Sequence, residues 1–262
     1  MENAITYSPL ERMAFASMQF FKDGENVFIG AGFPLAVSLL AKKTVTPNIK
    51  MIYEGGAFDS RSPHLPLSIA GPTIMYQAST AFTTAEIYGF LEERGFIDMG
   101  FIGGAQIDKY GNLNSTFIGS DYFKPKARLP GSGGAGDIST FSKRSIVILP
   151  HAKKRFVDNV HYLTSIGWKV KNWPSGEWVD REALGIPGKR EAVITTMGVL
   201  KFDDETKEIY LDQYFEGHTP TQIKENTGFD LDVSRAKQAE KPDPKIMKIL
   251  REEVDPGRLI IK

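Results

Sequence analysis

The chain has 262 residues, of which 41% are hydrophobic and 24% charged, as in an ordinary soluble protein large enough for a substantial core. Its 32 basic and 32 acidic side chains balance, so no net field favours nucleic acid, a membrane surface or an acidic partner. The lack of cysteine excludes disulfides, thiolate nucleophiles and cysteine-based metal sites. No leader pattern and no apolar run of the roughly 18 residues of a membrane helix is present, so we expect a cytoplasmic protein.

Helices and strands alternate in the first part of the chain. Ser8-Pro9-Leu10-Glu11 predicts a helix start, because serine caps the helix, proline fits the first turn and glutamate completes a capping box. We expect this helix to run to about Phe21. The apolar residues 27–29 then predict a strand, which enters the glycine loop 30–34 and a helix over 35–42. The loop lacks the third glycine of a dinucleotide-binding fingerprint, so it does not favour nucleotide binding.

The later apolar runs continue this alternation. They predict a helix over 84–94, strands over 97–102 and 145–149, a hairpin of 192–196 with 199–202, and a helix over 243–253. Strands that alternate with helices at such spacing favour an α/β fold with a mainly parallel sheet. No repeat or linker divides the chain, so we expect a single domain over residues 1–262.

Glu54 is the residue that most directly suggests a functional site. It ends the strand-like run 48–54 and precedes Gly55 and Gly56. In open α/β sheets, ligands bind beyond the carboxyl ends of the strands, and two glycines would let a substrate approach the backbone closely. A carboxylate there can act as a base, a metal ligand or a nucleophile. The alternative is an acid that only hydrogen-bonds the strand end.

Two further segments carry groups suited to ligand binding. Residues 131–136 contain four glycines, whose exposed N–H groups can form a nest for a phosphate or an oxyanion; the alternative is a surface turn. The segment 103–116 is rich in amide and hydroxyl side chains, although Gln106, Asn112 and Asn114 each fit a turn better than a ligand site. The four histidines include no pair spaced i, i+4, so we expect no metal site.

Taken together, these motifs resemble the β-subunit of family I CoA-transferases, and within it the glutaconate CoA-transferase branch. The resemblance extends through nearly the whole chain. The segments that carry it are Glu54-Gly55-Gly56, 103–108 with 111–116, 131–137, 30–34, 164–168 and 226–232.

The resemblance implies an open, twisted, mainly parallel α/β sheet flanked by helices, the CoA-transferase (NagB/RpiA-like) fold. It implies a hetero-oligomer with an α-subunit, and acyl-CoA and a carboxylic acid as substrates. Coenzyme A is then a co-substrate, with no permanently bound cofactor. Tyr53 and Gly55 flank the glutamate where oxo-acid CoA-transferases have serine and asparagine, which favours a dicarboxylic, glutaconate-like acid.

The resemblance also implies roles for individual residues. Glu54 is expected to be the nucleophile that forms a covalent glutamyl-CoA thioester, and Gly134, with Gly133 beside it, to donate a hydrogen bond to the oxyanion. A second donor is expected from the α-subunit, and Gln106 and Asn114 are candidates to line the site. A CoA-ester hydrolase or lyase of the same family, and a non-catalytic effector-binding module, remain as alternatives.

Overall fold

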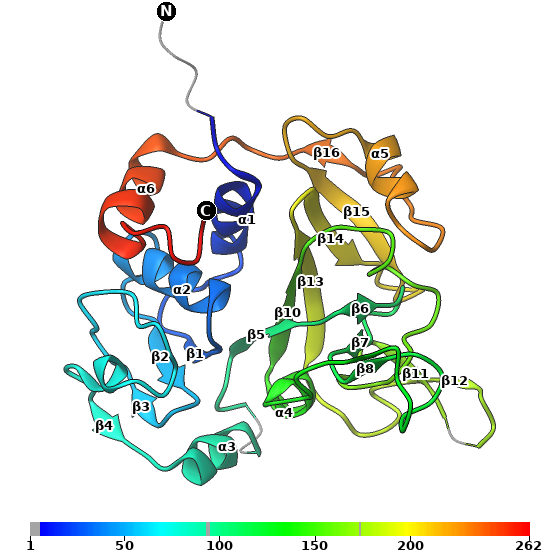
Figure 1. The fold of residues 1–262 in the computed structure, drawn as a ribbon, viewed down its shortest axis with the longest axis horizontal. Coiled ribbons are helices and arrows are strands. Elements are labelled where there is room, and N and C mark those ends of the chain that lie inside the picture. Colours follow the sequence, from blue (N-terminus) through cyan, green and yellow to red (C-terminus); the bar gives the residue numbers. More distant parts are fainter. Residues whose placement is uncertain (1–5, 93–94, 173) are drawn as a thin grey trace, which may run out of the picture.

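The computed structural model describes residues 6–92, 95–172 and 174–262. Ten strands in this part of the chain form one sheet (Figure 1), in the order β16 (Lys237–Gln238), β15 (Ile209–Tyr214), β14 (Gly198–Phe202), β13 (Lys189–Thr195), β10 (Arg144–Leu149), β5 (Met99–Gly103), β1 (Asn26–Ile29), β2 (Lys50–Tyr53), β3 (Ala57–Phe58) and β4 (Thr80–Ala81). The central strands β2, β1, β5, β10 and β13 are all parallel. This confirms the predicted open sheet of mostly parallel strands.

Short strand pairs lie outside this sheet. They are β6 (Gln106–Ile107) with β7 (Leu113–Asn114), β8 (Phe117–Ile118) with β9 (Ala127–Arg128), and β11 (Lys169–Lys171) with β12 (Trp178–Asp180). Figure 1 shows them beside one another at the same side of the sheet. They place the polar segment 103–116 just after the end of β5.

Helices cover both faces of the sheet. The described helices are α1 (Pro9–Met18), α2 (Phe33–Lys43), a 3-10 turn at Pro72–Met75, α3 (Thr84–Glu92), α4 (Ala135–Phe141), α5 (Pro220–Glu225), and α6 (Pro244–Ile249), which continues as a π-helical turn over Leu250–Val254. Figure 1 shows α1, α2 and α6 in one group, away from α3 and α4.

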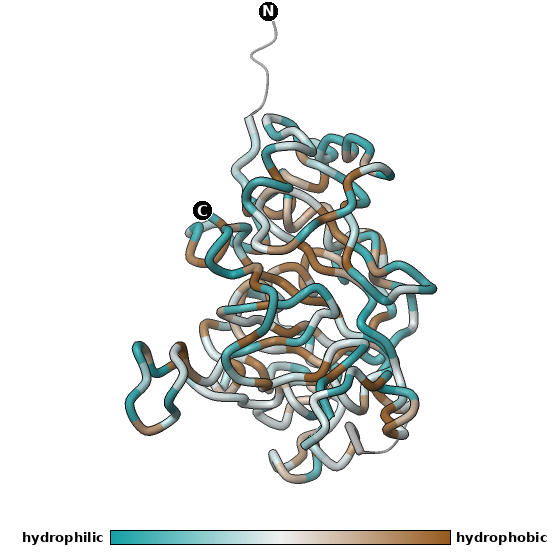
Figure 2. The backbone as a smooth tube through the Cα atoms, turned by 90° about the vertical axis from the view of Figure 1, so that its right-hand side faces the viewer, coloured by the Kyte–Doolittle hydropathy of each residue, from teal (hydrophilic) through white to brown (hydrophobic). Residues whose placement is uncertain are grey.

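The central strands alternate their side chains between two apolar cores. In β1, Val27 and Ile29 join the core that contains α1, α2 and α6, whereas Phe28 joins the core that contains Ile87 of α3 and Ile138 of α4. This alternation follows from the two-residue period of a strand. Figure 2 shows the apolar segments running through the middle of the molecule and the hydrophilic ones at its outer loops.

Several predicted elements are confirmed. Ser8 caps α1 and forms the predicted capping box with Glu11, although the helix ends at Met18, before Phe21. The strands β13 and β14 form the predicted antiparallel hairpin. The helix predicted over 84–94 is α3, and its last two predicted residues lie outside the described residues. The single domain over 1–262 stays a prediction.

Helix α4 was not predicted, because its sequence Ala-Gly-Asp-Ile-Ser-Thr-Phe is short and has a low intrinsic helix propensity. We expected residues 135–138 to lie in the glycine loop or directly after it, but they belong to this helix. Over the three described ranges, no helix is both long enough and apolar enough to cross a membrane.

Candidate active site

Glu54 lies at the carboxyl end of β2, where the parallel strands of the sheet end together. Tyr53, the last residue of β2, pairs in register with Ile29 of β1, so Glu54 borders the glycine loop that begins at Gly30. Because side chains alternate, Glu54 shares its face of the sheet with Ile52, which packs with α3 and α4. The glutamate is half-buried at the position that the sequence predicted.

The two glycines after Glu54 serve a purpose that differs from the predicted one. A Cβ atom on Gly55 would collide with the carbonyl oxygen of Ile69, and one on Gly56, where φ is +106°, would collide with that of Phe82. The N–H of Phe82 also donates to the carbonyl of Gly56 at 2.8 Å. The prediction that these glycines leave room for a substrate is therefore wrong, because protein backbone fills the space.

Helix α3 begins beside this glycine pair and brings a tyrosine to Glu54. Thr83 and Glu86 cap the helix reciprocally, at 2.7 and 3.2 Å, directly after Phe82 docks on Gly56. Further along the helix, the Tyr88 hydroxyl donates a hydrogen bond of 2.6 Å to Oε1 of Glu54. Burial and the neighbouring Glu54 carboxylate raise the pKa of Tyr88, so the phenol stays a donor at every ordinary pH.

The glycine loop before α4 meets the same tyrosine. Gly134 is the N-cap of α4, and the Tyr88 hydroxyl occupies the space that a side chain at this position would need. Helix α4 itself packs on β5, where Gly100 makes room for Ile138. Tyr88 thus joins two motifs, one around Glu54 and one around Gly134, that lie far apart in the sequence.

The backbone amides of this loop include groups suited to bind an oxyanion. Gly134 is buried, and among the described residues no acceptor takes the N–H group of Gly133 or Gly134. Gly133 has a φ of +47°, in the left-handed region that favours glycine. A buried N–H group without a partner is rare in native proteins, so the amide of Gly134 is a candidate to bind a ligand.

Gln106 and Asn114 lie in the β6–β7 pair and hydrogen-bond each other. Both side chains are buried, and Nδ2 of Asn114 donates to Oε1 of Gln106 at 2.8 Å and to the carbonyl of Phe117 at 2.7 Å. Oε1 of Gln106 also accepts the N–H of His161 at 3.1 Å. These hydrogen bonds hold the hairpin together, and none among the described residues joins either side chain to Glu54. Their part in substrate binding stays a prediction.

Asn112 is a turn residue, as its sequence context favours. Its side chain accepts from the N–H of Gly167 at 2.7 Å and donates to the carbonyl of Lys169 at 2.7 Å and to Asp108 at 2.8 Å. These bonds join the segment 103–116 to the segment 164–168. Two of the segments that carry the family resemblance therefore pack against each other.

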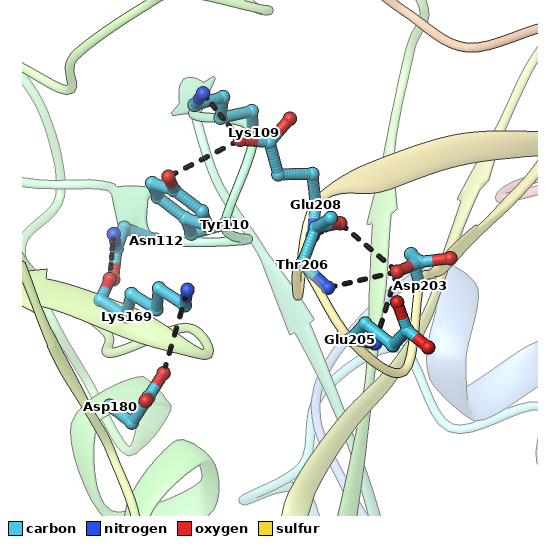
Figure 3. Close-up of polar contacts among 9 residues, drawn as sticks. All are labelled: Lys109, Tyr110, Asn112, Lys169, Asp180, Asp203, Glu205, Thr206 and Glu208. Carbon is cyan, nitrogen blue, oxygen red and sulfur yellow. Dashed lines mark hydrogen bonds and ion pairs between the residues drawn. The ribbon is translucent and has the colours of Figure 1, made fainter.

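The outer side of this turn carries an ion-pair cluster. Figure 3 shows Lys109 and Tyr110 at the carboxylate of Glu208, with distances of 2.5 and 3.3 Å, while Lys169 extends toward Asp180 at 3.9 Å. No hydrogen bond or ion pair among the described residues joins these side chains to Glu54. In the parts of the chain that the structure describes, no group of three or more His, Asp or Glu side chains is arranged to hold a metal ion.

The chain is similar to known proteins in sequence and in fold. The family model of coenzyme A transferase matches residues 10–226. The chain is 40% identical to the B-subunit of glutaconate CoA-transferase from Acidaminococcus fermentans, over 100% of this chain and 98% of that protein. This chain belongs to the coenzyme A transferase family.

Other comparisons with this family agree. The crystal structure of the A. fermentans glutaconate coenzyme A-transferase superposes with a TM-score of 0.90 at 38% identity, and the match covers 98% of each chain. The B-subunit of 3-oxoadipate CoA-transferase from Pseudomonas knackmussii is 38% identical over 86% of this chain and 84% of its own. The predicted family and fold are confirmed.

Tyr88 is the site residue that the sequence did not reveal. The sequence predicted the helix that carries it but gave no sign that the hydroxyl meets Glu54. Its position depends on how the loop from Gly56 to Phe82 returns to the sheet. The only local signal is a tyrosine within a short, largely apolar helix.

Proposed function

We propose that this chain is the β-subunit of a CoA-transferase that moves coenzyme A between an acyl-CoA and a carboxylic acid, with Glu54 as the nucleophile. The observation that carries the proposal is the meeting of Glu54, Tyr88 and Gly134 at the carboxyl edge of the sheet. It places a carboxylate near a backbone amide that has no acceptor among the described residues, and acyl transfer needs both groups.

The reaction begins when a carboxylate oxygen of Glu54 attacks the acyl carbon of the donor. The carbon–sulfur bond breaks, which gives an acyl-glutamyl anhydride and the CoA thiolate. The thiolate then attacks the glutamyl carbon, releases the donor acid and leaves an enzyme-CoA thioester. The acceptor carboxylate reverses these steps. Splitting one difficult transfer into covalent steps lowers each barrier, and the binding energy of CoA can be used at the reacting centre.

Each tetrahedral intermediate carries a negative oxygen that needs a hydrogen-bond donor. We assign the N–H of Gly134 to the oxyanion on the substrate acyl carbon, with Gly133 as its neighbour. One such donor contributes about 2.7–4 kcal/mol in well-studied acyl-transfer sites. The second donor comes from the α-subunit in this proposal.

The acid substrate is a dicarboxylate in this proposal. Two relatives are named for glutaconate and 3-oxoadipate, and both of these acids carry two carboxylates. Each of these relatives is also named as a B-subunit, which supports a heteromer with an α-subunit. The second carboxylate of the acid then needs a cationic partner that the α-subunit can supply.

The test is to trap the covalent intermediate. We would coexpress the chain with its α-subunit, incubate the complex with glutaryl-CoA, reduce the thioester with borohydride and locate the modified peptide by mass spectrometry. The expected result is a modification at Glu54 that disappears when an acid acceptor is added, while new acyl-CoA forms. The isosteric variant Glu54→Gln should show no modification.

The same experiment separates transfer from hydrolysis. A complex that consumes glutaryl-CoA equally fast with and without acceptor, and shows no modification at Glu54, would overturn the transferase proposal and indicate a CoA-ester hydrolase or lyase. A chain that purifies without any partner and binds no acyl-CoA would indicate an effector-binding module instead.

A further inference from the structure

The contact between Tyr88 and Glu54 raises a question about the second carbonyl of the reaction. An anhydride has two carbonyl carbons, one from the substrate and one from Glu54 itself. The N–H group of Gly134 can stabilise the oxyanion on the substrate carbon, but the thiolate attacks the carbon of Glu54. In the structure, the hydroxyl of Tyr88 already donates a hydrogen bond of 2.6 Å to the glutamyl oxygen Oε1.

We propose that Tyr88 is a catalytic residue whose hydroxyl stabilises the oxyanion that forms on Oε1 of Glu54 when the CoA thiolate attacks the glutamyl carbon. This inference rests on the function proposed above and adds a donor from this chain to it.

The atoms of the step balance without any other reagent. In the anhydride, Oε2 links the glutamyl carbon Cδ to the acyl group, and Oε1 is the carbonyl oxygen. The thiolate forms a sulfur–carbon bond to Cδ, and the electron pair of the carbonyl moves to Oε1. When the carbonyl re-forms, the bond between Cδ and Oε2 breaks, and the donor acid leaves as a carboxylate that carries Oε2. Tyr88 keeps its proton throughout.

The charge on Oε1 decides which step the hydrogen bond accelerates. Oε1 holds about half a negative charge in the carboxylate, almost none in the anhydride and a full charge in the tetrahedral intermediate. Because only interactions that strengthen toward the transition state increase the rate, Tyr88 accelerates the attack on Cδ. In the first step it stabilises the resting carboxylate and so does not help Glu54 to attack. The effect therefore has a definite sign for each step.

The surroundings of Tyr88 hold the hydroxyl in place for this role. The ring packs against Phe28, with 6.0 Å between ring centroids, and the hydroxyl lies against Gly134. Helix α3 is fixed at its start by Phe82 on Gly56. A donor held by two motifs of the site is preorganised, so no energy is spent on orienting it during the reaction.

The first test compares Tyr88→Phe with Tyr76→Phe in the complex with the α-subunit. Tyr88→Phe keeps the ring and removes only the hydroxyl, while Tyr76 has an exposed side chain whose hydroxyl has no partner among the described residues. We would measure formation of the Glu54 thioester in a single turnover, together with kcat, KM for acyl-CoA and the melting temperature. For Tyr88→Phe we expect thioester formation and kcat to fall roughly 10²–10³-fold, as when other oxyanion donors are removed, with unchanged KM and melting temperature. Tyr76→Phe should match the wild type.

A second measurement changes only the strength of the donor. Replacing Tyr88 by 3-fluorotyrosine keeps the size of the ring closely similar and makes the phenol more acidic, so its hydrogen bond to an oxyanion strengthens. We expect faster thioester formation. A purely structural role for Tyr88 would leave this rate unchanged.

The possible results distinguish a failure of the proposed function from a failure of the role assigned to Tyr88. If the wild type forms no thioester at Glu54, the proposed function itself fails. If the wild type forms it and Tyr88→Phe forms it equally fast or faster, Tyr88 is not the donor, and the proposed function stands. If Tyr88→Phe folds poorly, the fluorotyrosine protein decides, and an unchanged rate in that protein overturns the assignment.

Discussion

The hydroxyl oxygen of Tyr88 lies 2.5 Å from the point at which a Cβ atom on Gly134 would stand. Real Cβ atoms are not found so close to another heavy atom, so any side chain at position 134 must push Tyr88 or the backbone aside. The glycine therefore keeps Tyr88 at Glu54, in addition to the role proposed above for its own N–H group.

Gly134→Ala tests this relationship. The added methyl group should displace the Tyr88 hydroxyl from Glu54 and lower kcat by roughly 10²-fold, as other small displacements at active sites do. Gly136→Ala is the matched control in the same segment, because its Cβ would meet only the carbonyl of Thr164 at 3.7 Å, an ordinary contact. Steady-state kinetics of both variants should show a loss for the first alone. A Gly134→Ala enzyme with wild-type kcat would contradict the steric argument.

The pair Glu54 and Tyr88 should behave as one unit. Glu54→Asp keeps a carboxylate but withdraws it by one methylene, away from the Tyr88 hydroxyl, and we expect kcat to fall roughly 10²-fold or more. Tyr88→Phe should then add little to the loss in the Glu54→Asp protein, because the hydrogen bond is already broken. A double-mutant cycle on kcat measures this. Additive losses would show that the two residues act independently.

His151 should make the stability of the protein depend on pH. Its ring is buried between the hydroxyls of Thr195 and Thr227, each 3.2 Å away, and stacks on Phe156 with 4.2 Å between ring centroids. Burial lowers the pKa of His151 from 6.5 to about 4, so the folded protein holds the ring neutral while the unfolded chain protonates it. The free energy of unfolding should therefore fall by on the order of 3 kcal/mol as the pH drops from 6.5 to 4.

Urea unfolding at a series of pH values, for the wild type and His151→Gln, checks this expectation. Gln does not titrate, so the difference between the two proteins isolates the histidine. The wild type should lose stability relative to the variant between pH 6.5 and 4 and not above that range. Parallel pH profiles for the two proteins would rule the expectation out.

Substitution of Asp108 should be among the most destabilising changes outside the candidate active site. Its buried carboxylate accepts the N–H groups of Tyr110 and Asn112, both at 3.0 Å, and Nδ2 of Asn112 at 2.8 Å, and its charge acts on the fully buried Arg190. Asp108→Ala leaves these donors and the Arg190 charge uncompensated, which should lower the free energy of unfolding by about 3–5 kcal/mol. Asp121→Ala, which removes an exposed carboxylate that accepts one N–H group, should cost about 1 kcal/mol or less. Denaturant unfolding measures both; equal losses would contradict the expectation.

Local sequence was sufficient to place Glu54 but not its surroundings. An apolar run that ends at two glycines marks the end of a strand, and the parallel order of the sheet follows from the alternation of strands and helices. Tyr88 reaches Glu54 only because the segment between Gly56 and Phe82 folds back on itself, and no periodicity in the sequence encodes that path. Helix α4 escaped prediction because tertiary packing on Gly100, and not intrinsic propensity, holds it.

The polar segment 103–116 shows a second reason why the sequence predicts the candidate site only in part. Gln106 and Asn114 are residues that both turns and ligand sites use, and the sequence cannot say which partner their amides find. In the structure these partners are each other, His161 and the backbone of Thr116 and Phe117. The pairing of β6 with β7 determines these partners, because it brings together residues eight positions apart in the chain.

The collisions that surround Gly55 and Gly56 have a consequence for evolution. A mutation at either glycine would be removed by selection because the protein would fold poorly, whatever reaction it catalyses. If Glu54 is the nucleophile, as proposed, a mutation at this position would be removed only where the covalent chemistry is in use. A descendant that abandoned CoA transfer would therefore be expected to keep both glycines and to lose the glutamate. On the proposed mechanism, Glu54 is then the only one of the three motif residues whose presence indicates that a lineage still depends on CoA transfer.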